Sequence, residues 1–211
     1  MRKKEESFFK LITQKPWEAS QALLDNEHDG KTIAVSKAKL GVRTIMIVST
    51  VIFSLFVVSY ADRMFIHDWK NLPEPWLLWI NTLILILTSV VFHKTKVLAE
   101  NNEFEKTKNS LLVVGFLTFA FITGQLLVWQ HFVNLGQYAS TNPANAFFYT
   151  LTALHGLHVL GGLYFWAKAT TQLFKGNYNI SKIKQNVELC AIYWHFLLVV
   201  WFVLFGLMIA T

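Results

Sequence analysis

Five apolar stretches constrain the fold of this chain more than any other feature of its sequence. They cover residues 41–61, 76–93, 110–132, 146–168 and 187–210. Each is close to the ~20 residues that a helix needs to cross a hydrocarbon core about 30 Å thick. Because a bilayer offers no water to backbone amides and carbonyls, spanning segments must satisfy them internally, as helices do. The sequence therefore predicts an all-α, polytopic membrane protein with five transmembrane helices.

The amino-acid composition distinguishes an apolar membrane domain from a polar N-terminal segment. The 211 residues are 54% hydrophobic and only 15% charged, whereas soluble domains are about a quarter charged. We expect a five-helix transmembrane domain over 40–211, preceded by a cytoplasmic segment over 1–39. That segment either forms a short interfacial helix broken at Pro16 or stays disordered until a partner orders it. Its basic start lacks a following apolar run, so no cleavable signal peptide is expected.

The basic residues alternate from one side of the predicted spans to the other. Nine lie before or at the start of the first span, and the four loops then hold two, four, none and four, with none after the last span. Cytoplasmic loops of membrane proteins are enriched in Lys and Arg. The pattern places the N-terminus in the cytoplasm and the C-terminus outside. It also explains the net charge of +6 without a nucleic-acid partner.

Few ionisable groups lie inside the predicted spans. Glu188 is the one carboxylate within them, at the cytoplasmic start of the last span, where it would complement the helix dipole or pair with a basic residue of a partner subunit. This scarcity of acids argues against a proton pump or channel within the chain. The single cysteine, Cys190, excludes an internal disulfide and a multi-cysteine metal site, and we interpret it as a small buried apolar residue.

Polar side chains from four spans fall at similar predicted depths. With ~1.5 Å of rise per residue, Thr50, Asn81, His158 and His195 lie about 12–18 Å from the cytoplasmic end, and His155 lies a turn farther out. Unpaired polar groups in hydrocarbon are costly. We expect these five residues to form a structural layer of hydrogen bonds between helices.

The histidines allow other interpretations. His158 and His195 lie at similar depth on successive spans and could bind haem, as in a membrane quinol or cytochrome b-like redox module. Together with His155 they could instead bind a metal ion. A small transporter is a further class. Glycines also mark one face on each of the third and fourth spans, which predicts that these two helices touch; they are Gly115, Gly124, Gly156, Gly161 and Gly162.

Two motifs resemble the last two helices of the cytochrome c oxidase subunit III family. The fourth span carries Phe147, Phe148, Thr152, His155, Gly156, His158, Val159 and Gly162. The fifth carries Glu188, Tyr193, Trp194, His195, Phe196, Val199, Val200 and Trp201. The resemblance covers residues 40–211 and is closest to the short, five-helix bacterial form.

The resemblance implies a subunit without catalytic, cofactor-binding or metal-binding residues of its own. Haem and copper would belong to the catalytic subunit I, against which this chain would pack in a bacterial cytoplasmic membrane. Subunit II would be a further partner, with room for a small subunit IV or a second subunit III. A member of the family would also bind phospholipid and protect the oxidase from inactivation during turnover.

The chain departs from the family pattern at three acidic positions. Thr50 stands where the family has a buried Glu, Gln130 where it often has an acid, and Leu198 where an Asp follows the Tyr-Trp-His-Phe motif. The resemblance therefore implies a diverged subunit III.

Overall fold

The computed structural model describes residues 37–72, 76–175 and 180–210. The predictions made for residues 1–36 lie outside this part of the chain. One compact unit extends from Gly41 to Thr211, and its architecture is all-helical.

Five long helices account for most of the described chain. They are α3 (Lys37–Arg63), α4 (Trp76–Glu100), α5 (Phe104–Asn134), α6 (Pro143–Phe174) and α7 (Ile180–Ile209). All five are long and apolar enough to cross a membrane. The prediction of an all-α membrane protein with five spans is confirmed.

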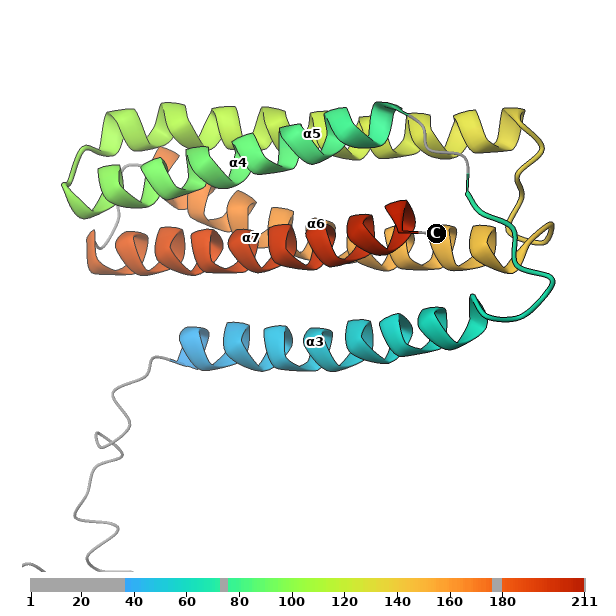
Figure 1. Ribbon diagram of the computed structural model, residues 1–211. Helices are drawn as coiled ribbons and strands as arrows, with labels where there is room; N and C mark the ends of the chain where they lie inside the picture. The colour runs from blue at the N-terminus through green and yellow to red at the C-terminus, as the bar shows by residue number, and fades with distance from the viewer. Residues whose placement is uncertain (1–36, 73–75, 176–179, 211) are drawn as a thin grey trace, which may run out of the picture. The chain divides into compact units, whose positions relative to one another are not determined.

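Four of the helices form a bundle. Helix α4 packs against α5 and α7, and α6 packs against the same two helices, so that α4 and α5 lie above α6 and α7 in the view of Figure 1. Helix α3 is much less enclosed. Only 17% of the residues in its most apolar 18-residue stretch are buried, compared with 33–44% in the corresponding stretches of the other four helices.

The helices are longer than the apolar stretches, chiefly at one end of the bundle. Helix α4 continues seven residues past the predicted end at residue 93, and α7 begins seven residues before the predicted start at 187. The added turns between α4 and α5 carry ion pairs one helical turn apart, such as Lys106 with Glu103 and Lys96 with Glu100. Hydropathy detects only the part of a helix that lies in hydrocarbon, so it missed these polar turns.

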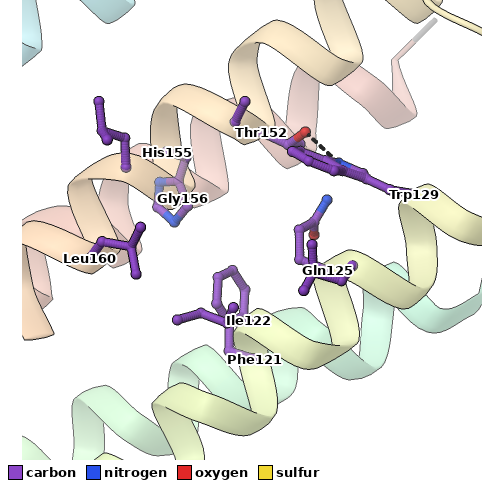
Figure 2. A pocket seen from close by; sticks show the side chains of 11 residues that line it. Phe121, Ile122, Gln125, Trp129, Thr152, His155, Gly156 and Leu160 are labelled. Atoms are coloured by element: carbon purple, nitrogen blue, oxygen red, sulfur yellow. Dashed lines mark hydrogen bonds between the residues drawn. The ribbon is translucent and has the colours of Figure 1, made fainter.

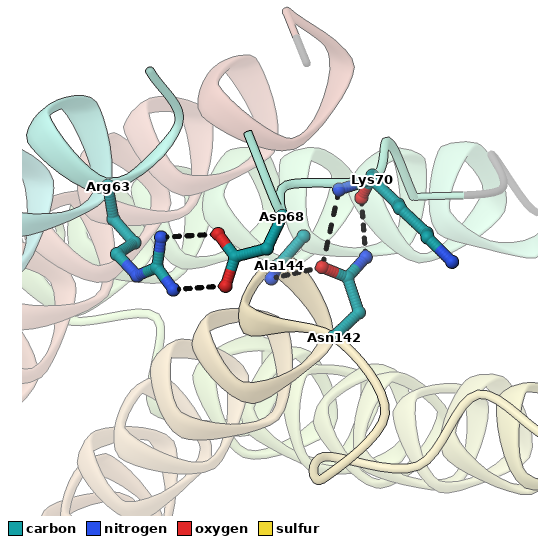
Figure 3. A network of polar contacts seen from close by, with 5 residues as sticks. All are labelled: Arg63, Asp68, Lys70, Asn142 and Ala144. Atoms are coloured by element: carbon teal, nitrogen blue, oxygen red, sulfur yellow. Dashed lines mark hydrogen bonds and ion pairs between the residues drawn. The ribbon is translucent and has the colours of Figure 1, made fainter. Parts of the chain in front are cut away.

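A polar network joins the loop after α3 to the start of α6 (Figure 3). Asn142 is the N-cap of α6, and its Oδ1 accepts from the backbone N–H of Ala144 at 3.2 Å. The same side chain donates from Nδ2 to the Lys70 carbonyl at 2.5 Å and accepts from the Lys70 N–H at 3.3 Å. Pro143 follows at the first helical position, where its missing N–H costs nothing. One side chain thus both begins a helix and holds a loop.

Aromatic packing secures the same end of α3. Tyr60 is fully buried, with its ring centroid 4.9 Å from that of Trp69 and 5.4 Å from that of Phe147 on α6. Next to it, Arg63 forms a two-pronged ion pair with Asp68 at 2.6–2.7 Å. The hydrogen bonds from the guanidinium lower the pKa of the Asp68 carboxyl below its ordinary value.

The predicted contact between the third and fourth spans is confirmed, with a refinement. Gly115 on α5 faces the ring of Trp166 on α6, whose Nε1 donates to the Leu111 carbonyl at 2.9 Å. Gly124, from the same predicted face, instead lies against the side chain of Asn81 on α4. The small residues of α5 therefore serve two neighbouring helices.

Candidate functional site

Tyr193 and Trp194, two motif residues of α7, lie at its contact with α6. Gly162 leaves room for the Trp194 ring, since a Cβ at that position would lie 2.5 Å from Cζ3. Trp194 is 1% exposed and also packs on Phe92 of α4, with ring centroids 4.8 Å apart. Tyr193 donates from its hydroxyl to the His158 carbonyl at 3.2 Å. These side chains hold three helices together.

Trp201, about two turns farther along α7, lies at the centre of the bundle. Its Nε1 donates to the hydroxyl of Thr82 on α4 at 2.9 Å. Its ring centroid is 5.0 Å from that of His155 and 5.2 Å from that of Phe121. The side chain thus contacts α4, α5 and α6 and is fully buried.

His158 uses both ring nitrogens within the protein. Nδ1 donates to the Leu154 carbonyl at 2.8 Å. In a neutral imidazole the other nitrogen is then an acceptor, and Nε2 accepts from the hydroxyl of Ser49 on α3 at 2.8 Å. The ring of Phe53 lies 5.3 Å away, also on α3. His158 therefore links α6 to α3.

His195 engages a different helix. Its Nδ1 is hydrogen-bonded to the hydroxyl of Ser89 on α4 at 2.5 Å, and its ring centroid is 6.2 Å from that of His93. His158 is thus directed to α3 and His195 to α4. In the described residues, no three His, Cys, Asp or Glu side chains are placed to hold one metal ion. The three histidines are not gathered around a common point.

The predicted polar layer is divided into separate contacts. Asn81 donates to Gln125 of α5 at 3.4 Å, eight residues and so about 12 Å along α4 from Ser89, the partner of His195. Thr50 is exposed and donates to the Met46 carbonyl of its own helix. Its neighbour Ser49 is the residue that faces the bundle, because a one-residue step turns a side chain by about 100° around a helix.

Glu188 is not in the first turn of its helix. Because α7 begins at Ile180, this carboxylate lies in the third turn, beyond the first turn to which the dipole effect is limited. The side chain is half-buried and takes part in an interaction within the protein. The other motif residue, Phe196, is also half-buried and lines a groove between α3 and α7.

A pocket between α5 and α6 holds His155 and Gln125. Its volume is about 230 Å³, and its walls are largely aromatic and aliphatic. Figure 2 shows His155 and Gln125 directed toward it from opposite helices, with the Trp129 Nε1 donating to the Thr152 hydroxyl at 3.0 Å above them. Both ring nitrogens of His155 and Nε2 of Gln125 lack a hydrogen-bond partner within the described chain. Residue counting along the spans predicts similar depths for His155 and Gln125, but it does not show that they share a cavity.

Known proteins with similar sequences are oxidase subunits. The sequence model of the family Cytochrome c oxidase subunit III matches residues 23–210. A "Cytochrome c oxidase subunit 3" of Synechocystis sp. is 31% identical over 161 residues, which cover 74% of this chain and 68% of the relative. The protein of the same name from Thermostichus vulcanus is 29% identical over 194 residues, 86% of this chain and 94% of the relative.

A relative with another name extends the comparison. The "Cytochrome bo(3) ubiquinol oxidase subunit 3" of Buchnera aphidicola subsp. Schizaphis graminum is 26% identical over 164 residues, 75% of this chain and 84% of the relative. The family match covers most of the chain, including all five membrane helices. The chain belongs to the cytochrome c oxidase subunit III family and is a subunit of a haem-copper oxidase.

Proposed function

We propose that this chain is a non-catalytic subunit that packs in the membrane against the haem- and copper-bearing catalytic subunit I and sustains its oxygen reduction. Subunit II completes the assembly, with a small subunit IV or a second subunit III as further candidates. Haem and copper belong to the catalytic partner, and the location is a bacterial cytoplasmic membrane.

The main support for this proposal is that the motif side chains make contacts between helices. Tyr193, Trp194 and Trp201 pack α7 onto its neighbours, and His158 and His195 each bond to a serine on another helix. Interhelical packing and hydrogen bonds are what stabilise a helix bundle in lipid. The residues that define the family motifs thus act on the architecture of the subunit, which supports a role in assembly.

The main experiment follows oxygen consumption of the oxidase through many turnovers, with and without this subunit. Removal should leave the initial rate nearly intact, because the electron carriers stay with the other subunits. Activity should then decline faster than in the complete complex. Haem spectra of both preparations provide the control for an intact catalytic subunit. Immediate and complete loss of activity with unchanged haem spectra would contradict the proposal.

Phospholipid binding is part of the proposal. An apolar groove of about 460 Å³ lies between α3 and α7, and Thr50 and Ser54 are its polar residues. Such a surface suits an acyl chain. Replacing Ser54 with Phe should reduce the phospholipid that the purified complex retains, measured by mass spectrometry. Thr123→Phe, which adds the same side chain at an exposed position of α5 outside the groove, should not. Equal lipid content in both variants would argue against this groove.

The orientation in the membrane is tested separately. The alternation of basic residues supports a cytoplasmic N-terminus and an external C-terminus. Cysteines introduced at Asn71 and Gln137 should react with an impermeant thiol reagent added outside, and a cysteine at Lys106 should not. Labelling in the opposite pattern would refute this orientation.

A further inference from the structure

The pocket between α5 and α6 has the position of a site that is filled from the lipid. It is formed by the second half of α5 and the middle of α6, within the apolar parts of both helices. Leu126, Leu157 and Leu160 form its rim, and each is more than half exposed on the membrane-facing surface. A molecule dissolved in the bilayer can therefore enter between the two helices without crossing water.

Two polar side chains at the base of the pocket have unused hydrogen-bonding groups. His155 is 0% exposed and Gln125 is 7% exposed. Among the residues that the structure describes, neither nitrogen of the imidazole has a hydrogen-bond partner, nor does Nε2 of the amide. Buried polar groups are nearly always hydrogen-bonded, and the exceptions need an explanation. The neighbouring polar pair, Trp129 and Thr152, is satisfied internally, so among the described residues that line the pocket the unused groups belong to His155 and Gln125. Oδ1 of Asn81, whose amide donates to Gln125 from α4, also lacks a partner in the described chain.

The groups available define the chemistry of a ligand. The amide offers N–H donors, and a neutral imidazole offers one donor and one acceptor. A carbonyl oxygen could accept from both side chains, and a hydroxyl could also donate to the imidazole. All residues lining the pocket in the described part of the chain are uncharged. A phosphate or ammonium head would lack a counter-charge in an apolar cavity and is excluded by its desolvation cost.

The size and shape of the pocket further restrict the chemical class of the ligand. At about 230 Å³ it exceeds the ~150 Å³ of an engineered cavity that binds benzene, so a single ring fits with substituents. Phe121 and Trp129 contribute aromatic walls to it, against which a flat ring can stack. An apolar tail would leave between the leucines of the rim.

We propose that this pocket binds one uncharged, ring-headed membrane lipid of the quinone type, whose ring oxygen is hydrogen-bonded by Gln125 and His155. The ligand is held, not oxidised or reduced, by this subunit. The site is independent of the proposed role in assembly, because it concerns binding and not oxygen consumption.

The test uses the purified oxidase complex and a photoreactive benzoquinone with a short alkyl tail. Labelling should be saturable, and mass spectrometry should locate the adducts in peptides covering 121–129 or 152–160. A short-tail quinone without the photoreactive group should compete, and a zwitterionic phospholipid should not. Replacement of His155 by Phe, or of Gln125 by Leu, should each weaken binding roughly 5- to 10-fold, the loss of one neutral hydrogen bond.

A variant that leaves both polar side chains in place keeps the proposal falsifiable if His155→Phe does not fold. Gly156 lines the pocket and has open space where a side chain would begin, so Gly156→Leu should occlude the site and abolish labelling. Gly206→Leu adds the same side chain at another open position, on the exposed face of α7 away from the pocket, and should label like the wild type.

The outcomes separate the proposal from its alternatives. Adducts only in other subunits, competition by phospholipid at equal strength, or unchanged labelling in Gly156→Leu would each overturn it. Unchanged affinity in both polar variants would also overturn it, since the unused groups would then be satisfied by water. If Gly156→Leu loses the labelling but the complex consumes oxygen normally, the result supports the binding site. It does not bear on the proposed role in assembly.

Discussion

Gly162 on α6 provides the sharpest test of how this bundle is packed. A Cβ at this position would lie 2.5 Å from the Trp194 ring, which is buried between α6 and Phe92 of α4. The ring cannot move without disturbing both contacts, and overpacking of this kind costs about 1–3 kcal/mol. The neighbouring Gly161 is the matched control, because a Cβ there would meet only the Tyr193 hydroxyl at 3.7 Å, an ordinary contact.

Both Gly→Ala substitutions gain the same helix propensity, about 1 kcal/mol. Gly162→Ala should therefore be less stable than Gly161→Ala by about 1–3 kcal/mol. Unfolding of the purified subunit in mixed micelles of rising SDS content, followed by circular dichroism, measures the difference. If the two variants unfold at the same SDS fraction, the Trp194 ring is not held as described, and the close contact of α6 with α7 must be reconsidered.

Three further predictions concern single contacts. Asn142→Ala should cost about 1 kcal/mol for the lost helix cap and more for the loop bonds, whereas Asn142→Asp should keep the cap and lose only the donor, as unfolding in mixed micelles would show. A double-mutant cycle of Trp201→Phe with Thr82→Val should give a coupling of about 0.5–1.5 kcal/mol, the net value of a neutral hydrogen bond. Arg63→Gln should raise the pKa of Asp68 toward its ordinary value in an NMR titration; because folding lowers this pKa, the contribution of the pair is present above the ordinary pKa and lost as pH falls through the lowered one.

Hydropathy predicted the number and type of the helices but not their full length. The apolar runs are set by the thickness of the bilayer, so they are visible in any single sequence. The ends of α4 and α5 continue in polar turns with ion pairs such as that of Lys106 with Glu103. The polar start of α7 is held by a hydrogen bond from Lys184 to the Glu100 carbonyl. Such turns look like loop sequence, and only the hydrogen-bonded structure shows them to be helical.

The rotation of each helix was the harder property to predict. Depth along an axis follows from residue counting, and it correctly brought His155 near the level of Gln125. Which residue faces inward depends on the rotation of the helix about its axis. On α3 the prediction was wrong by one position, because Ser49 faces the bundle and the predicted Thr50 does not. A low polar content on every face leaves little amphipathic signal to set that rotation in a membrane helix.

The sparse enclosure of α3 has a consequence for how the subunit is made. Membrane helices first insert individually and then associate, and α3 is synthesised before the other four described helices. Its partners on α6 are synthesised much later, since Tyr60 and Phe147 are 87 positions apart and Ser49 and His158 are 109 positions apart. We expect α3 to remain surrounded by lipid until the other four helices have associated. We also expect it to be the first helix to dissociate when the subunit unfolds. Its amides should therefore show the least protection from hydrogen exchange among the five spans.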